Sequence, residues 1–551
     1  MNKKIKLSCV IFVSIILIAV SCGDQSNDYE ETENVVTTQE IYENVEFLDD
    51  EPLNILYMYN YYWGVGIHAG DNMYANHVTL SNLCKEKLGF PLNFIQVRQE
   101  QNGNNSYATA IRSGQKADLI FPTMIVGGVL ENSSRHYWLD SYIEEGLYLD
   151  LTPYMERFCP QMVINHERYP YLKDMYMKEG KIYALYAGMP QITTTALIAK
   201  NELLEEVDVS IEKINTFDAL YEFMDRLYQG REPESDKNKI MVHPATLTKY
   251  SIYNSGYYPL RQHYEDIVFK LNDERCIPYP LERTEILEHL TDQFSRFFVH
   301  SYFTPEPYYY DSYEDFDLCL IPRSLHIIKW FSEYCHNETD NYYKKHSIVL
   351  FEDIKPVIDD VDTLRPIIVP ATSTQPEKAM IFMQWVMTDK EAADILTFGS
   401  QLLSTNHYRY ASDGTIIPEK YNTIYGFCHM IANFSDKAFL CGNKDFDLIN
   451  QYRELTYTAE YPIFYKKLDA QHSHYRLLEN FHDIPTIGLS MTRTSYLDNR
   501  IKEWMNNPYD SFNLELITSE MYGKVDMKRY MTRCEEFVKS ILESGDIIYG
   551  N

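Results

Sequence analysis

Positive charge is scarce in this sequence relative to negative charge. Its 50 Lys and Arg residues are outnumbered by 80 Asp and Glu residues, and the formal net charge is −30 at pH 7. Nucleic acids carry a dense negative charge, so a chain of this composition repels them and disfavours phosphate-rich partners. We therefore expect no nucleic-acid partner.

The motifs of several large catalytic and metal-binding classes are also missing. The sequence has no H-E-x-x-H, no G-x-S-x-G, no Walker loop and no dinucleotide-binding glycine fingerprint. It contains 10 cysteines but no C-x-x-C pair, so neither a zinc ribbon nor a thioredoxin-type site is indicated. We expect buried free thiols in place of a disulfide framework, and we predict no metal, no cofactor and no catalytic residue.

An apolar run long enough to span a membrane comfortably is lacking at the N-terminus. A lysine-containing start is followed by an apolar stretch from Val10 to Val20, about a dozen residues where a helical span needs about 20. A basic start, a short apolar core and small residues before a cleavage point are typical of a secretory signal. We therefore predict that residues 1–21 are a signal peptide.

The segment Ala19–Gly23 resembles the lipobox of bacterial lipoproteins, in which a cysteine follows small residues. That resemblance implies that Cys22 becomes the mature N-terminus and carries lipid. A plain signal peptide with an incidental cysteine is the alternative. The polar, acidic residues 22–51 are predicted to be a flexible tether. We thus expect a lipid-anchored protein on the extracytoplasmic face of the cell membrane.

Strands and helices alternate in the part of the chain that follows the tether. The pattern predicts strands at 53–58, 91–97 and 117–122, and helices at 74–88 and 107–113. This alternation is typical of an α/β sheet with mainly parallel strands. Since 551 residues exceed what one hydrophobic core usually supports, we expect two lobes.

Later helices are marked by their start signals. Thr216 precedes an apolar stripe at helical spacing and is predicted to be its N-cap. Thr374–Glu377 has the capping-box pattern before the apolar positions of 379–387, and Thr388–Glu391 repeats that pattern. We assign Trp385, which lies within the apolar stripe, to packing.

Several segments between residues 50 and 400 match the pattern of one family. They are ADLIF at 117–121, LDLTPY at 149–154, EGKIYAL at 179–185, TFDAL at 216–220 and PATSTQPEKA at 370–379, the last followed by TDKE at 388–391. In this order they resemble the extracellular solute-binding lipoproteins of bacterial ABC transporters, in particular the large sugar-type members of family 1.

The resemblance implies an α/β fold, a two-lobe clamp like the type II periplasmic binding proteins, with discontinuous lobes and a helical C-terminal extension. Lobe 1 is expected to comprise 52–186 and 362–402, and lobe 2 to comprise 187–361 and 403–551. The implied function is binding of a carbohydrate, an oligosaccharide, in the cleft between the lobes. The implied partners are the permease subunits of an ABC importer. We expect a monomer with no enzymatic activity.

Aromatic residues follow the first predicted strand. Ligands of α/β sheets lie off the carboxyl ends of the strands, and sugar rings present C–H faces that stack on aromatic rings. The ligand-binding candidates here are Tyr59, Asn60, Tyr61, Tyr62 and Trp63. Packing of some of these rings into the lobe is the alternative.

Five further candidates come from other parts of the chain. Thr123 and Met124 follow the third predicted strand, where a simple turn is the alternative. Gln191 lies near the predicted hinge and could bond ligand hydroxyls or merely satisfy the backbone. Arg323 and Trp330 fall where the family often has a second-lobe wall; a surface arginine and a core tryptophan are the alternative.

Two other functions stay open on the sequence alone. A surface lipoprotein of the same fold could bind peptide or act as a sensor. The acidic and aromatic segment Tyr310–Asp317 contains paired carboxylates, which could cleave a glycosidic bond in an envelope glycosidase.

Overall fold

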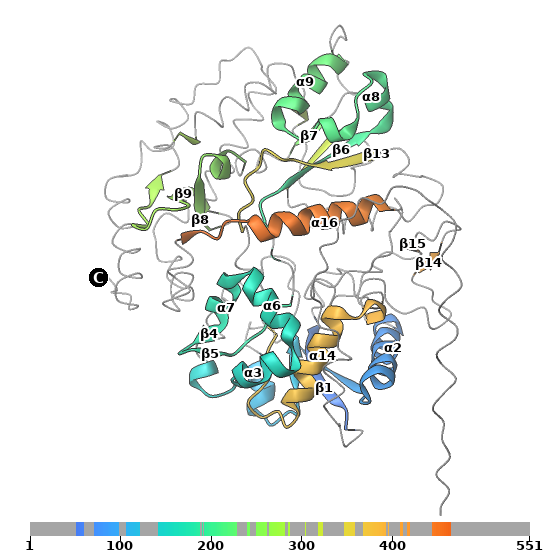
Figure 1. Ribbon diagram of the computed structural model, residues 1–551, viewed down its shortest axis with the longest axis vertical. Coiled ribbons are helices and arrows are strands. Elements are labelled where there is room, and N and C mark those ends of the chain that lie inside the picture. The colour runs from blue at the N-terminus through green and yellow to red at the C-terminus, as the bar shows by residue number, and fades with distance from the viewer. Residues whose placement is uncertain are drawn as a thin grey trace, which may run out of the picture. The chain divides into compact units, whose positions relative to one another are not determined.

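The structure is a computed structural model (Figure 1). It describes residues 51–59, 71–98, 106–121, 142–187, 190, 192–228, 240–242, 250–261, 264–280, 285–286, 303–304, 318–322, 346–358, 367–392, 395, 408–410, 416–418 and 443–463.

The first sheet is parallel, as the sequence predicts. Its strands β1 (Leu53–Tyr59), β2 (Leu92–Arg98) and β3 (Leu119–Phe121) lie in the order β2-β1-β3. Both neighbours run parallel to β1. The first five residues of β1 are all buried, and a near-continuous apolar run is expected of a strand covered on both faces.

Helices connect these strands. Helix α2 (Asp71–Leu88) leads from β1 to β2, and helix α3 (Ser106–Arg112) leads from β2 to β3. The chain leaves α2 through Gly89, whose φ is +86° and whose N–H donates to the carbonyl of Lys85. Glycine adopts this left-handed conformation without a steric penalty, which makes it a common helix terminator. These two helices confirm the predicted ones.

Three short helices follow the first sheet in sequence. They are α5 (Thr152–Phe158), α6 (Pro160–Arg168) and α7 (Pro170–Tyr176). Each has a proline in its first turn, where the missing N–H costs no hydrogen bond and the fixed φ suits a helix.

A tight hairpin comes next, formed by β4 (Met177–Lys178) and β5 (Lys181–Ile182). The two turn residues, Glu179 and Gly180, both have positive φ, 53° and 78°. Such a two-residue turn matches the right-handed twist of the flanking strands.

A distant segment returns to the first sheet and completes its core. Ile368 pairs antiparallel with Ile120, beside β3. Helix α14 (Pro376–Thr388) follows and packs against α5 and α6 (Figure 1). Trp385 is 1% exposed within this core, which confirms its assignment to packing.

The start of α14 differs from the expected capping box. The helix begins at Pro376, so the N-cap is Gln375, and its side chain makes no capping bond. The Oγ of Ser373 accepts the backbone N–H of Gln375 instead, at 3.1 Å. The prediction of Thr374 as the cap is therefore wrong, because proline fixes the first helical position one residue later than the box pattern requires.

The second expected capping box is also displaced by one residue. Thr388 is still in α14, where its hydroxyl donates to the carbonyl of Gln384 at 2.8 Å. The carboxylate of Asp389 accepts the N–H of Ala392 at 2.9 Å. Asp389 thus takes the role predicted for Thr388, because Thr388 is already bonded to the preceding turn.

We call the buried cluster around the first sheet core 1. Its side chains come from two stretches of the chain, within 53–187 and within 367–392. Sequentially distant stretches must therefore both be in place before this core is complete.

The second large sheet has mixed strands around β6 (Thr195–Lys200). Its order is β11-β7-β12-β6-β13, and β6 runs antiparallel to both of its neighbours. The other strands are β7 (Ile240–Val242), β11 (Phe303–Thr304), β12 (Leu318–Pro322) and β13 (His346–Leu350).

Helices α8 (Asn201–Glu206), η1 (Ile211–Lys213) and α9 (Phe217–Tyr228) follow β6 (Figure 1). Side chains from these helices form a second buried cluster, core 2, with β6 and Phe351. The hydroxyl of Thr216 accepts the N–H of Ala219 at 3.0 Å, which confirms the predicted N-cap. Core 1 and core 2 share no residue.

The remaining described elements are two small sheets and one long helix. Strands β8 (Tyr257–Arg261), β9 (Tyr264–Lys270) and β10 (Tyr279–Pro280) form an antiparallel sheet. Strands β14 (Tyr408–Tyr410) and β15 (Ile416–Pro418) pair with each other.

Helix α16 (Asn443–Thr458) lies within residues 403–551. Most of that range falls outside the described residues, so the expected helical C-terminal extension stays a prediction. Among the helices that the structure describes, none combines the length and the apolar character needed to cross a membrane.

Candidate functional site

The carboxyl ends of the first sheet lie at one edge. Tyr59, the last residue of β1, is in register with Arg98 at the end of β2, and β3 ends two positions earlier, with Phe121 opposite Tyr57. Parallel strands that end together leave their following loops at the same edge, where α/β proteins bind ligands.

Most residues predicted for ligand binding follow these ends directly. Asn60, Tyr61, Tyr62 and Trp63 come after β1, and Thr123 and Met124 come after β3 with one residue between. These six residues lie outside the described part of the chain, whereas Tyr59 is described as the end of β1. The register places the ends of β1 and β3 at the same edge of the sheet, and the roles of these six residues stay predictions.

The other predicted residues belong to different elements. Arg323 directly follows β12, and Gln191 comes between two described residues, Pro190 and Ile192. Gln191, Arg323, Trp330 and Cys22 all lie outside the described residues.

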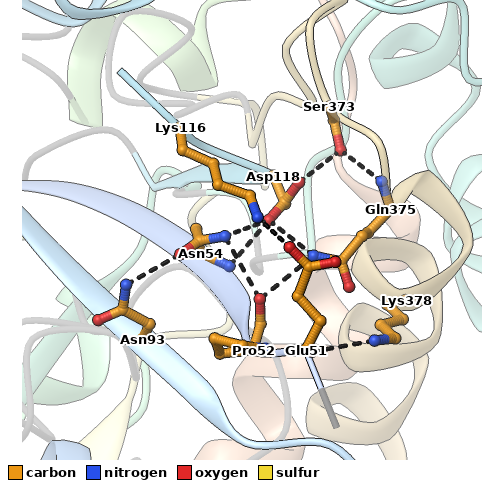
Figure 2. A network of polar contacts seen from close by, with 9 residues as sticks. All are labelled: Glu51, Pro52, Asn54, Asn93, Lys116, Asp118, Ser373, Gln375 and Lys378. Atoms are coloured by element: carbon orange, nitrogen blue, oxygen red, sulfur yellow. Dashed lines mark hydrogen bonds and ion pairs between the residues drawn. The ribbon is translucent and has the colours of Figure 1, made fainter. Parts of the chain in front are cut away.

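The opposite, amino-terminal edge of the first sheet carries a buried polar network (Figure 2). Asp118, 1% exposed, is at its centre. Its carboxylate accepts the backbone N–H of Asn54 at 3.0 Å and the side-chain amide of Asn54 at 2.8 Å. It also accepts the hydroxyl of Ser373 at 2.9 Å and the amide of Gln375 at 3.3 Å. A carboxylate satisfied in this way joins three chain segments.

The same network holds the residues that precede β1. The amide of Gln375 donates to the carbonyl of Pro52 at 3.2 Å, and the ammonium of Lys378 donates to the carbonyl of Glu51 at 2.9 Å (Figure 2). Glu51 also forms an ion pair with Lys116. All these groups are engaged in joining chain segments, which identifies the network as structural.

Two passages of the chain connect core 1 with core 2, and they are paired. Leu185 and Ile367 exchange both backbone hydrogen bonds, at 2.8 and 2.7 Å. Further along, Ile192 pairs antiparallel with Ile358. The hydroxyl of Thr193 donates to the carbonyl of Lys355 at 2.7 Å and accepts the N–H of Val357 at 2.8 Å. The first passage thus runs from Leu185 to Thr193, and the second from Lys355 to Ile367.

A later segment joins these passages. Glu460 donates its backbone N–H to the carbonyl of Pro356 and accepts the N–H of Ile358, at 2.9 and 3.0 Å. Its carboxylate pairs with the ammonium of Lys355 at 2.8 Å. In α16, the hydroxyl of Tyr452 bonds to both Pro190 and Ile192.

Tyrosines from α16 and from the region of α7 surround this junction. The rings of Tyr171 and Tyr461 stack with centroids 4.5 Å apart, and the hydroxyl of Tyr169 bonds to that of Thr456 at 2.6 Å. Burial raises the pKa of Tyr171 well above its usual value and also raises that of Tyr169. These phenols therefore stay neutral and serve packing and hydrogen bonding.

Sequence reasoning did not single out this tyrosine cluster. The 47 tyrosines of the chain indicate an unusual use of the residue, but no periodic pattern relates residues near 170 to residues near 455. The pairing is a long-range contact, which neither helical nor strand periodicity encodes.

Two histidines, the half-buried His77 and the buried His166, have strongly shifted pKa values. Desolvation lowers the pKa of His77 to about 3, and its ring stacks on Phe94 with centroids 3.9 Å apart. Desolvation, with a smaller contribution from Lys173, lowers the pKa of His166 to about 4. Both rings are neutral at pH 7, so neither contributes positive charge to a site.

The carboxylate of Asp353 also has a shifted pKa and a structural role. Burial raises the pKa of Asp353, although its carboxylate accepts the N–H of Phe217 at the start of α9.

Cys84, Cys159 and Cys276 are free, buried thiols, which agrees with the expectation for these three. Across the ranges that the structure describes, no group of His, Cys, Asp and Glu side chains is arranged to hold a metal ion.

Comparison with known proteins gives no match in sequence, either to a family model or to a curated protein. The structure is similar to the N-glycan transport solute binding protein NgtS from Streptococcus pneumoniae. The TM-score is 0.54 at 11% identity, over 90% of this chain and 100% of that chain. At this identity the likeness concerns the fold alone.

Two further solved structures belong to the same functional group. One is an extracellular solute-binding protein from Bifidobacterium longum subsp. infantis, with 11% identity, a TM-score of 0.46 and 90% and 99% of the two chains covered. The other is the ABC-transporter substrate binding protein FusA of S. pneumoniae in complex with kestose, with 10% identity, a TM-score of 0.45 and 89% and 99% covered. We base the fold assignment on the first comparison, because these two TM-scores lie below 0.5.

Proposed function

We propose that this chain is a lipid-anchored solute-binding protein of an ABC importer and that it binds an oligosaccharide between two lobes. The observation that carries the proposal is the pair of separate α/β cores joined by two hydrogen-bonded passages. The likeness of the fold to that of an N-glycan transport solute binding protein supports it.

The proposed mechanism is binding without chemistry. Two bodies with separate cores can move relative to each other about the passages that join them. A ligand that contacts both bodies favours the conformation in which both contacts exist. The permease subunits of the importer would then distinguish the ligand-bound form from the free form.

The chemistry of the candidate residues favours a sugar. Tyr59, Tyr61, Tyr62 and Trp63 offer aromatic faces for stacking, and Asn60 and Gln191 offer amides for hydroxyl groups. A net charge of −30 disfavours a polyanionic polysaccharide. A neutral oligosaccharide, such as a fragment of an N-glycan, therefore suits the chain best.

The experiment that tests this function is a thermal-shift screen of the purified mature protein. A panel of neutral N-glycan fragments, other oligosaccharides and short peptides is compared. Because binding stabilises the folded state by mass action, a ligand at 100 times its Kd adds about 2.7 kcal/mol, and we expect this for an oligosaccharide. Stabilisation by peptides alone, or hydrolysis of the sugars, would contradict the proposal.

The matched variant is Trp63→Ala, with Trp63→Phe as its control. Loss of a stacking ring is expected to weaken sugar binding by about 1–3 kcal/mol, by analogy with the stacking of flat rings on aromatic side chains. The phenylalanine variant keeps a stacking face and should retain most of the affinity. Isothermal titration calorimetry measures both, and equal affinity in the alanine variant would remove the stacking role.

A further inference from the structure

The hydroxyl of Tyr452 makes two hydrogen bonds to the first passage. It donates to the carbonyl of Pro190 at 3.1 Å and accepts the N–H of Ile192 at 3.1 Å. Tyr452 and Ile192 are each 1% exposed, and Pro190 is buried as well. Bulk water is therefore kept away from these backbone groups, and an unpaired group at such a site is costly.

Only a hydroxyl can make this pair of bonds from a single atom. It offers one donor and accepts at its lone pairs, so it satisfies a carbonyl and an N–H that are two residues apart. The two bonds hold the first passage, which connects core 1 with core 2, at Pro190 and at Ile192.

The element that carries Tyr452 is itself held firmly. Thr456, one turn further along α16, bonds to Tyr169 at 2.6 Å, and Tyr461 stacks on Tyr171. Glu460 is bonded to the second passage on both sides of Val357. Tyr452 therefore relates the position of the first passage to that of the second and to the helices beside core 1.

We propose that Tyr452 is a positioning residue for ligand binding, which holds the first passage at Pro190 and at Ile192 in the arrangement that ligand binding requires. The inference rests on the function proposed above. The phenol oxygen of Tyr452 is required for this positioning, and the aromatic ring alone is not sufficient.

The test compares Tyr452→Phe with Tyr250→Phe. Both tyrosines are buried and both lose one hydroxyl. The hydroxyl of Tyr250 bonds to the carboxylate of Asp353 at 3.3 Å, near the start of α9 and two residues before Lys355. The control therefore reports what loss of a buried tyrosine hydroxyl does when the bonds to Pro190 and Ile192 are kept.

Two measurements are made on each full-length mature variant. Calorimetry gives the Kd for a neutral N-glycan fragment, and amide hydrogen exchange of the free protein reports on the N–H of Ile192. We expect Tyr452→Phe to bind about threefold to tenfold more weakly, the range that corresponds to one or two hydrogen bonds of ordinary net strength. The amide of Ile192 should exchange faster, and Tyr250→Phe should show neither change.

The outcomes separate this inference from the proposed function. An unchanged Kd in Tyr452→Phe, with the wild type binding the sugar, overturns the inference and leaves the function intact. A wild type that binds no oligosaccharide overturns the function. In that case, unchanged exchange of the Ile192 amide in Tyr452→Phe overturns the positioning role too. Faster exchange in that variant shows that the Tyr452 hydroxyl fixes the first passage.

Discussion

Asp118 joins three parts of the chain through one carboxylate. Its donors come from β1, from the turn before α14 and from the helix start itself. A buried acceptor with this many donors is worth more to the fold than a surface ion pair, because its removal leaves several buried donors unpaired. The sequence alone could not identify the partners of Asp118, since Gln375 and Ser373 are far away in the chain.

We predict that Asp118→Ala lowers the free energy of unfolding by about 3 kcal/mol or more, since four donor groups lose this acceptor. Urea unfolding followed by circular dichroism measures this change. The control is Glu145→Ala, which removes a half-exposed ion pair with Arg112 and should change stability by less than about 1 kcal/mol. Similar losses in the two variants would contradict the role given to Asp118.

His166 predicts a pH dependence of stability. It is 4% exposed, and within the described residues neither ring nitrogen has a hydrogen-bond partner. Burial and Lys173 lower its pKa from 6.5 to about 4. Between these two values the unfolded chain binds a proton that the folded chain does not. The contribution of neutral His166 to the free energy of unfolding is therefore fully present above pH 6.5. It is lost as the pH falls towards 4.

The expected loss from His166 is about 3 kcal/mol across this window. Urea unfolding at pH 7.0 and pH 4.5 measures it in the wild type and in His166→Phe, which cannot be protonated. The phenylalanine variant should lose less stability on acidification than the wild type does. An identical loss in both proteins would assign the pH dependence to other groups, such as His77.

At the scale of elements, the start of α14 is the most informative departure from the sequence-based expectation. The pattern at 374–377 fits a capping box, yet Pro376 begins the helix and Ser373 satisfies the free N–H of Gln375. The existence of this helix, and those of α2, α3 and α9, followed from apolar spacing. The details of the cap did not, because they depend on Asp118, a tertiary partner of Ser373.

We expect Ser373→Ala to destabilise the protein by about 1–2 kcal/mol, because both the cap of α14 and one donor to Asp118 are lost. Thr374→Ala is the control. Thr374 is exposed, so its replacement should cost less than about 0.5 kcal/mol. Thermal and urea unfolding of the two variants measure the difference, and a larger loss for Thr374→Ala would restore the capping box.

At the scale of the whole molecule, the α/β character and the parallel first sheet were predictable from the alternation of strands and helices. The tyrosine cluster around α16 was not, because its contacts join residues separated by 287 positions, as between Tyr169 and Thr456. The candidate ligand residues were chosen from chemistry and from the strand ends. The strand register places the ends of β1 and β3 at the same edge of the sheet. The roles of the candidate side chains are tested by the binding experiments.

The proposed lipid anchor concerns the whole molecule in its cellular setting. If Cys22 carries lipid, Cys22→Ser should move the protein from the membrane fraction to the soluble fraction, because a short apolar signal alone gives no stable anchor. Fractionation followed by immunoblotting measures the shift, with Cys84→Ser, a buried thiol in core 1, as the control. Continued recovery of Cys22→Ser with membranes would overturn the lipid assignment.

Core 1 is built from two distant stretches of the chain, and this has a consequence for biosynthesis. Pro52 receives a hydrogen bond from Gln375, 323 positions later in the chain. A ribosome that adds about 5–20 residues per second needs on the order of half a minute to make that stretch. Throughout this interval core 1 lacks the side chains that residues 367–392 contribute. Translation order thus sets the earliest moment at which the first sheet can be fully packed, after core 2 has been synthesised.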